Sequence, residues 1–278
     1  MKLPSDFQFS QSSLQSYVNC PYLFYLRYIQ NLAWPALQTS DALEMEAHMK
    51  QGNRFHALIH MYFLGLPPER LLEIAMADPL PGMVEWWELF LGFAKKSING
   101  TCLPEFTLLT EFAGATLMAK FDLLNIQDDY LVIYDWKTNL HPIKRSFLQK
   151  ALQTRIYPFI LSKENQSLNL GRAFSPDQIK MIYWQANSPE APIVFDYSTD
   201  AYNADKLYLG KLVSEIQAFE PGDFLRTSNH HRCKFCSYRS LCDRGDSAGL
   251  LSEFDDDQDS QRLDDFHIDL DSIEEIAI

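Results

Sequence analysis

The sequence lacks any apolar run long enough to cross a membrane, because no eighteen consecutive apolar residues occur among its 278 residues. A membrane-spanning helix needs about 20 such residues, so no membrane span is expected. The first residues, MKLPSDFQFSQSS, also lack the apolar segment of a secretory signal peptide. A G-x4-G-K-[ST] phosphate-binding loop, which helicases carry, is absent as well. We therefore expect a cytoplasmic protein without a helicase activity of its own.

Basic residues are scarce, and the net charge of −13 at first argues against a protein that binds nucleic acid. The acidic residues are unevenly placed, however. Residues 253–278 hold eleven acidic side chains and one arginine, whereas the preceding 252 residues hold 26 acidic and 23 basic ones. A locally basic surface can therefore still exist on the body of the protein.

The tail, residues 249–278, is too acidic and too poor in apolar residues to form a core, so we predict that it is disordered. A passive solubilising role, competition with DNA for a basic loop and docking on a partner all stay open.

The five cysteines are odd in number and come without a secretion signal, which argues against a disulfide framework. Cys233, Cys236 and Cys242 form a C-x2-C-x5-C pattern, and the distant Cys20 can supply a fourth thiolate. Four thiolates suit either zinc or a 4Fe-4S cluster, and the spacing does not choose between them. Either centre would tie the N-terminal helices to the C-terminal segment. Basic side chains that could contact phosphates crowd the same loop: Arg226, His230, His231, Arg232, Lys234, Arg239 and Arg244.

The stretch from Ala119 to Lys137, AKFDLLNIQDDYLVIYDWK, predicts a β-hairpin. We expect strands at 118–124 and 130–134, with a turn at 125–129. Asp122 falls late on the first strand and Asp135 late on the second, and Lys137 shares a face with Asp135 because side chains alternate along a strand. Two neighbouring carboxylates favour a cation such as Mg²⁺ or Mn²⁺ between them. Taken alone, the pattern also fits two surface acids and a surface lysine.

The remaining pattern predicts an α/β fold, a mixed central sheet with helices on both faces. The expected elements are two short helices joined at Cys20, a helix at 45–64, two or three helices within 67–97, a strand at 106–113, a helix at 144–163, strands at 178–185 and 192–197, and a helix at 199–219.

Two pairs of side chains four residues apart lie on single helix faces. His56 and His60 form one pair, and Gln153 and Tyr157 form the other. Each residue also has a structural interpretation, as a partly buried histidine, a solvated glutamine or a core tyrosine. Glu111, on the strand before the hairpin, could face the same site.

Six motifs together resemble the RecB-like branch of the PD-(D/E)XK nucleases, in particular its iron–sulfur members such as the CRISPR-associated RecB-like nucleases and the AddB nuclease domain. They occur in the family's order and span residues 10 to 242: SQSSLQSYVNCPYLFYLRY, GNRFH, KFD, YDWKT, QTRIY and CKFCSYRSLC. The resemblance implies a restriction-endonuclease-like core in residues 1–248, with a helical insertion at about 65–105, an iron–sulfur segment at 226–245 and termini stapled by the cluster. Phe121 stands where many relatives carry proline, and the motifs do not cover Glu111.

The resemblance also implies the roles of individual residues. His56, Asp122, Asp135 and the Trp136 carbonyl would bind the catalytic Mg²⁺ or Mn²⁺, and Lys137 would be the catalytic lysine. Gln153 and Tyr157 match the family's Q-x3-Y motif, which supports the site and positions DNA. The 4Fe-4S ligands would be Cys20, Cys233, Cys236 and Cys242.

These features predict a metal-dependent DNA nuclease, and the lack of a base-reading module favours an exonuclease acting on DNA that is single-stranded or has single-stranded ends. A helicase or another protein is a possible partner. Two alternatives stay open: a catalytically silent DNA-binding subunit of a repair or CRISPR adaptation complex, and a zinc-stapled interaction protein.

Overall fold

The computed structural model describes residues 3–4, 6–32, 40–168, 171–220, 222–233 and 236–245. The acidic tail, for which the sequence predicts disorder, lies outside these residues. Within them, no helix is both long enough and apolar enough to cross a membrane.

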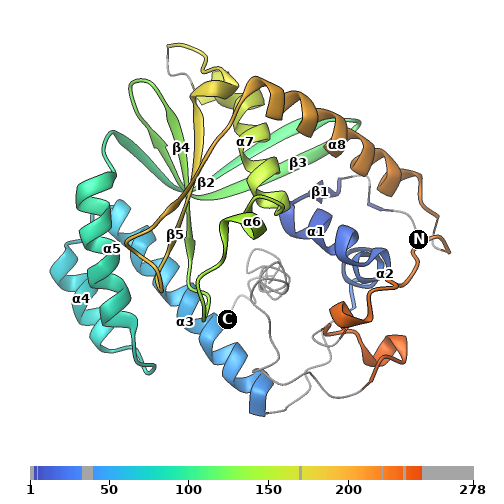
Figure 1. Ribbon diagram of the computed structural model, residues 1–278, viewed down its shortest axis with the longest axis horizontal. Helices are drawn as coiled ribbons and strands as arrows, with labels where there is room; N and C mark the ends of the chain where they lie inside the picture. The colour runs from blue at the N-terminus through green and yellow to red at the C-terminus, as the bar shows by residue number, and fades with distance from the viewer. Residues whose placement is uncertain are drawn as a thin grey trace, which may run out of the picture.

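A mixed β-sheet forms the centre of the protein (Figure 1). Its strands are β1 (Gln8–Phe9), β2 (Thr101–Phe112), β3 (Ala115–Ile126), β4 (Leu131–Lys137), β5 (Ile179–Gln185) and β6 (Ile193–Asp196). The β1–β3 and β4–β5 pairs are parallel, and the other pairs are antiparallel. This arrangement confirms the predicted α/β architecture with a mixed central sheet.

Strand β3 organises the sheet because its two edges are used differently. One edge pairs with β2 from Ala115 to Ile126, with an interruption at Asp122. The other edge pairs with β1 at residues 116–117 and with β4 only at residues 123–126. Residues 118–122 therefore have no strand partner on that edge, and this interval is where Asp122 lies.

Helices cover both faces of the sheet (Figure 1). One face carries α3 (Ser40–Phe63), α4 (Pro68–Met76) and α5 (Met83–Ser97), and the other carries α1 (Gln11–Asn19), α7 (Leu152–Glu164) and α8 (Thr199–Ala218). Strand β4 explains this double cover, because its residues from Leu131 to Trp136 are all buried. Leu131 and Ile133 pack with α7 and α8, while Val132 and Tyr134 pack with the other three helices, as the alternation of side chains along a strand requires.

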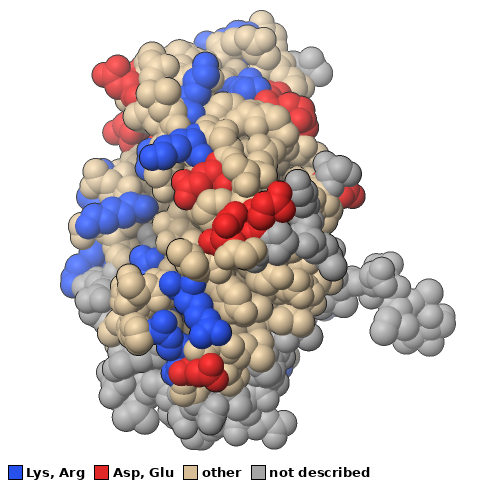
Figure 2. Space-filling model, turned by 90° about the vertical axis from the view of Figure 1, so that its right-hand side faces the viewer, with Lys and Arg blue, Asp and Glu red and all other residues tan. Residues whose placement is uncertain are grey.

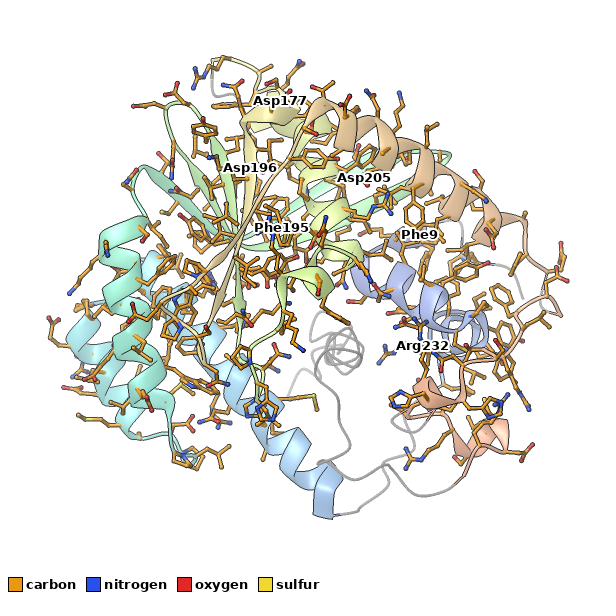
Figure 3. The ribbon with its side chains drawn as sticks, in the orientation of Figure 1. Phe9, Asp177, Phe195, Asp196, Asp205 and Arg232 are labelled. Atoms are coloured by element: carbon orange, nitrogen blue, oxygen red, sulfur yellow. The ribbon has the colours of Figure 1, made fainter. Side chains whose placement is uncertain are left out.

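Two helices on the same face are joined by a buried acid. Asp205 of α8 accepts a hydrogen bond from Arg155 Nε of α7 at 2.6 Å and one from the Tyr197 hydroxyl at 3.1 Å. Figure 3 shows Asp205 on the side of α8 that faces the sheet. Because a buried acid is costly unless it is paired, these contacts hold α8 against α7 in one position.

The last described part of the chain lies beside α1 and α2 (Pro21–Phe24), where short 3-10 turns at His230–Cys233 and Ser240–Cys242 pack (Figure 1). Arg232 donates hydrogen bonds to the Val18 and Asn19 carbonyls, at 3.2 and 3.1 Å. The predicted joint at Cys20 is confirmed, because α1 ends at Asn19 and Cys20 is the N-cap of α2.

The strands of the hairpin differ from the predicted ones. β3 runs to Ile126, so Asn125, which we expected in a turn, lies inside the strand and is fully buried. Its side-chain amide donates to the Asn99 carbonyl at 2.7 Å and lies 3.3 Å from the Thr101 carbonyl. Because these bonds satisfy the polar side chain, a turn-forming residue is tolerated in a buried strand. β4 begins at Leu131 and extends to Lys137, beyond its predicted end.

The single helix predicted at 144–163 is wrong, because the chain forms α6 (Arg145–Leu148) and then α7. Ala151 has an extended backbone, with φ −63° and ψ 138°, and acts as the N-cap of α7. The Leu152 amide lies 3.4 Å from Gln15 Oε1 of α1, so a side chain from another helix helps to satisfy the new helix start. Gln153 consequently stands in the first turn of α7, directed at the sheet.

Candidate active site

Asp122 and Asp135 come together where the β3–β4 ladder ends. The last pair on that side is Leu123 with Tyr134, so Asp122 and Asp135 occupy the next opposing positions. There the Asp122 carboxylate replaces a strand partner, because its Oδ2 accepts a hydrogen bond from the Trp136 amide at 2.8 Å. Asp135 is only 3% exposed, and the Trp136 amide ties Asp122 to the strand that carries Asp135.

Gln153 connects Asp135 to Lys137. The Gln153 side chain donates from Nε2 to Asp135 Oδ1 at 2.5 Å and accepts at Oε1 from Lys137 Nζ at 3.1 Å. Lys137 Nζ also lies 3.1 Å from Asp135 Oδ2, so each of the three side chains contacts the other two. Lys137 and Asp135 thus share a face of β4, as predicted. Each of these two nearly buried charges is paired with the other, which offsets the cost of burying it.

His56 reaches the same place from α3. Its Nδ1 lies 3.6 Å from Asp122 Oδ1. Burial lowers the pKa of His56, but the negative charges of Asp122, Asp135 and Glu105 outweigh burial and raise this pKa to about 9. The same partnership acts on Asp122: burial raises the pKa of this carboxyl, but the charge and hydrogen bond of His56, the Trp136 amide and the Lys137 charge together lower it by more, so the net shift is downward.

Tyr157 forms a wall of the site on α7, one turn beyond Gln153. Its ring stands edge-on to Phe121, with the ring centres 5.2 Å apart. Burial, followed by the charges of Asp135 and Asp122, raises the pKa of Tyr157 far above its usual value. The phenol is therefore protonated at neutral pH and is available as a hydrogen-bonding group.

Glu105 is a site neighbour that sequence reasoning missed. The β2–β3 register is the same on both sides of it, so Glu105 lies opposite Asp122, yet its φ is +50° and no pairing with Asp122 forms. Like charges directly opposite each other repel. The Glu105 carboxylate instead pairs with Lys120 at 3.2 Å, and its charge still reaches His56. Only the strand register, which brings these two acids opposite each other, could have revealed it.

Glu111 does not join this group. It lies opposite Thr116 near the tip of the β2–β3 hairpin, and its carboxylate accepts a hydrogen bond from the Thr116 hydroxyl at 2.6 Å. Glu111 lies six positions after Glu105 along β2, which is a distance of roughly 20 Å in an extended strand. The suggestion that Glu111 faces the site is therefore wrong.

The donor groups gathered here suit a hard divalent cation. Two carboxylates and one imidazole converge, and oxygen-rich donor sets with an occasional histidine match Mg²⁺ or Mn²⁺. In the present arrangement the carboxylates are engaged by Lys137, Gln153, His56 and the Trp136 amide. Within the described residues, no three His, Cys, Asp or Glu side chains are grouped closely enough to hold a metal ion. The residues fit the cation chemically, and binding requires them to exchange these partners.

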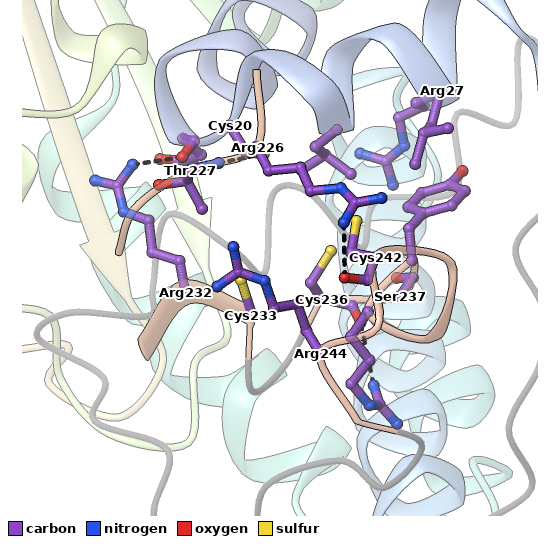
Figure 4. A pocket seen from close by; sticks show the side chains of 15 residues that line it. Cys20, Arg27, Arg226, Thr227, Arg232, Cys233, Cys236, Ser237, Cys242 and Arg244 are labelled. Carbon is purple, nitrogen blue, oxygen red and sulfur yellow. Dashed lines mark hydrogen bonds between the residues drawn. The ribbon is translucent and has the colours of Figure 1, made fainter. Parts of the chain in front are cut away.

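Four cysteines line a second location, a pocket between α1–α2 and the C-terminal turns (Figure 4). Cys20, Cys233, Cys236 and Cys242 all border it, whereas Cys102 lies on β2 near Asn125. None of the five forms a disulfide. Backbone amides already point at the sulfur atoms: the Thr227 amide donates to Cys20 Sγ at 3.4 Å, and the Tyr238 amide donates to Cys236. Such amides favour thiolates, so the pocket fits a metal or cluster in chemical type.

Protons compete with metal in this pocket. Burial raises the pKa of Cys236 to about 11, and the charges of the other three cysteines raise it too. Burial likewise raises the pKa of Cys242. A metal that binds thiolates must therefore displace protons, and its binding will depend on pH.

Arginines surround the cysteine pocket and hold its loops. Arg226 donates to the Cys242 carbonyl at 3.1 Å, and Arg239 donates to the Cys236 carbonyl at 3.1 Å. Figure 2 shows Lys and Arg side chains gathered in the lower part of the face that carries this segment. Arg232, labelled in Figures 3 and 4, reaches from the turn to α1. These arginines thus cross-link the segment, in addition to making it basic.

Comparison with known proteins agrees with this architecture. Residues 8–243 match the family profile of the PD-(D/E)XK nuclease superfamily. No curated protein matches the chain significantly.

Among solved structures, a suspected exonuclease from Eubacterium rectale is similar, with a TM-score of 0.50 and 12% identity over 85% of this chain and 88% of that one. The protein SSO0001 aligns over 84% of this chain and 85% of its own, with 14% identity and a TM-score of 0.42. At such identities the first likeness concerns the fold alone. The family match covers most of the chain, and the chain belongs to the PD-(D/E)XK nuclease superfamily.

Proposed function

We propose that this protein is a metal-dependent deoxyribonuclease of the RecB-like branch, with Asp122, Asp135 and Lys137 at its active site. The observation that carries the proposal is the convergence of these side chains with His56 and Gln153 at the end of the β3–β4 ladder. Membership of the superfamily supports hydrolysis of a phosphodiester bond. DNA as the substrate, and a role in repair, recombination or defence, are parts of the proposal.

His56, Asp122, Asp135 and the Trp136 carbonyl would hold Mg²⁺ or Mn²⁺, which supplies a Lewis acid and lowers the pKa of bound water. Lys137 keeps its ammonium group beside Asp135 and can stabilise the negative charge that develops on the phosphate. Gln153 orients both Asp135 and Lys137 through its two hydrogen bonds. Tyr157, protonated and partly buried, can donate to a DNA phosphate at the wall of the site.

The direct test incubates anaerobically purified protein with end-labelled single-stranded and double-stranded DNA and Mn²⁺ or Mg²⁺. We expect metal-dependent release of label from the parent and none from Asp135→Asn. Asp196→Asn is the matched control, because it neutralises a largely exposed carboxylate on β6 that pairs with Lys180. Release of label that does not depend on metal, or equal release by the parent and both variants, would contradict the assignment. An inactive parent that still binds DNA would favour the catalytically silent subunit.

An exonuclease is proposed over an endonuclease. The similar Eubacterium rectale protein bears an exonuclease name, which supports this choice without deciding it for a chain of 12% identity. Circular single-stranded DNA has no end, so an exonuclease leaves it intact while it degrades the linear form of the same sequence. Cleavage of the circle would overturn the choice. A helicase or another partner would supply unwinding on long duplexes.

For the cysteine pocket we propose a 4Fe-4S cluster bound by Cys20, Cys233, Cys236 and Cys242, with zinc as the alternative. The grouping of the four cysteines and the amide bonds to sulfur support a thiolate-bound centre of either kind. Iron, sulfide and zinc analysis of anaerobically purified protein distinguishes the two. Stoichiometric zinc without iron would favour the zinc-stapled interaction protein.

A further inference from the structure

Gly52 lies in the interior of α3, where its backbone conformation gives no reason for a glycine. Its φ is not positive, and glycine in a helix interior is less favourable than alanine because it loses more conformational freedom on folding. The surroundings supply the reason. A Cβ atom built on Gly52 would lie 2.6 Å from the Thr138 hydroxyl oxygen, closer than non-bonded atoms approach. A side chain at position 52 therefore requires the Thr138 hydroxyl to move away.

Thr138 is the residue after Lys137, at the end of the strand that carries Asp135. A second residue of α3 contacts it, because His48 Nε2 lies 2.6 Å from the Thr138 carbonyl oxygen. The His48 ring is itself held edge-on to Trp86 of α5, with the ring centres 5.9 Å apart. Two residues of α3, four positions apart on one side of the helix, therefore seat it on the end of β4.

His56 follows four residues after Gly52 on the same side of the helix, where it reaches Asp122. The height of α3 above Thr138 thus sets the position of His56 relative to Asp122. Asp122 is in turn fixed to β4 through the Trp136 amide. A continuous set of contacts therefore links the two places. Helix α3 contacts the end of β4 at Thr138, β4 is bonded to Asp122, and Asp122 contacts His56 of α3.

We propose that Gly52 and His48 are positioning residues, which seat α3 on Thr138 and thereby place His56 for metal binding. Glycine is required because its missing side chain allows the close approach, and the His48 contact holds the helix there. The proposal rests on the proposed function in one respect, namely that His56 is a metal ligand. The contact itself stands on the structure.

The chain offers a rescue test. Gly52→Ala pushes a methyl group into the Thr138 hydroxyl, and Thr138→Ala removes that hydroxyl while keeping the carbonyl that His48 contacts. Gly92→Ala is the matched control, because Gly92 lies in the interior of helix α5 with nothing within 4 Å of an added Cβ. Mn²⁺ affinity is measured by calorimetry on the full-length protein, and thermal unfolding of the same variants is measured without metal.

We expect Gly52→Ala to weaken Mn²⁺ binding about tenfold or more, as removal of a residue that orients a ligand does. Gly92→Ala should bind as the parent does. The double variant Gly52→Ala/Thr138→Ala should regain affinity within about threefold of Thr138→Ala alone. Metal-free unfolding should be non-additive, with the double variant more stable than the two single changes predict.

Parent-like Mn²⁺ affinity in Gly52→Ala, or a double variant as weak as Gly52→Ala, would overturn the positioning role. If Gly52→Ala does not fold, the double variant decides, since recovery of folding together with Mn²⁺ binding supports the proposal and failure to recover contradicts it. A parent that binds no Mn²⁺ would defeat the proposed function and the positioning role together. Even then, non-additive effects of Gly52→Ala and Thr138→Ala on the unfolding free energy would establish the contact. If the parent binds Mn²⁺ but the two effects on the unfolding free energy simply add, the contact alone is overturned.

Discussion

The carboxylate site and the cysteine pocket are built in opposite ways. Asp122 and Asp135 stand on strands of a sheet that helices cover on both faces, and side chains of two helices engage them before any metal arrives. The cysteine pocket is formed by short helical turns and loops, joined by arginine side chains that donate to backbone carbonyls. The difference teaches that the fold shapes the first site, whereas in the second a metal centre would contribute to folding itself.

The carboxylate site also has charges that balance one another without metal. Lys137 and Gln153 hold Asp135, and His56 holds Asp122. Removing one member then leaves its partner buried and uncompensated, which is costly. Asp135→Ala would leave Lys137, whose side chain is only 12% exposed, without this carboxylate. The isosteric Asp135→Asn removes the same charge but keeps the shape of the side chain, so it disturbs the packing less than Asp135→Ala does.

The largest expected effect is on catalysis. Asp135→Asn should reduce DNA cleavage by roughly 10³-fold or more, because a neutral amide binds a divalent cation weakly and no longer pairs with Lys137. Its unfolding curve should show a folded protein that is less stable than the parent, because the buried Lys137 charge loses its partner. Single-turnover cleavage of end-labelled DNA with Mn²⁺, together with thermal unfolding, checks both statements. Parent-like cleavage would remove Asp135 from the site.

The next largest effect is expected at the cysteine pocket, on the stability of the segments that form it. Cys233→Ser should lose the proposed metal centre and loosen the packing of residues 226–245 against α1 and α2, because metal binding there would be coupled to folding. Hydrogen exchange should rise in α1, α2 and residues 226–245 and stay unchanged in β3 and β4. Cys102→Ser is the control, since Cys102 lies outside the pocket. Equal exchange in Cys233→Ser and parent would mean that the pocket needs no metal.

A smaller catalytic effect is expected from Lys137. Lys137→Met keeps the length of the side chain and removes its charge, so kcat should fall about 10²-fold through lost stabilisation of the transition state. The KM for DNA should change much less, because the ammonium group is held inside the site by Asp135 and Gln153. Steady-state kinetics separates the two quantities. A rise in KM with unchanged kcat would make Lys137 a binding residue only.

The smallest effect concerns how firmly α3 is held. Arg54 of α3 donates a hydrogen bond to Asp78 and thereby lowers the pKa of that carboxyl, although burial opposes the shift. Because the folded pKa lies below the unfolded one, this stabilisation is present above pH 3.8 and is lost as the pH falls through the folded pKa. Arg54→Met should cost less than about 1 kcal/mol at pH 7, since the arginine is 40% exposed and solvent screens the pair. The difference in unfolding free energy from the parent should vanish in acid, and a difference that persists there would point to lost packing.

Local pattern determined a large part of this protein. Alternation along β4 placed Asp135 and Lys137 on one face, and the two salt-bridged atoms are 3.1 Å apart. Cysteine spacing singled out the residues that line the pocket, and Cys20-Pro21 marked the helix joint. These features depend on residues close in sequence, whose relative directions follow from the geometry of a strand or a helix. The local pattern did not predict the strand ends or the helix break before Leu152. At the break, a distant side chain, Gln15, accepts from the Leu152 amide.

Only the tertiary structure decided which distant residues meet. The Asp122 carboxylate can bond the Trp136 amide because, on that edge of β3, residues 118–122 pair with neither β1 nor β4. Glu105 enters the surroundings of the site through a strand register that no local pattern specifies. Gly52 is explained by Thr138, 86 positions further along the chain. The physical reason is common to all three: strand pairing and close packing are set by the free energy of the whole core, which a short window of sequence does not contain.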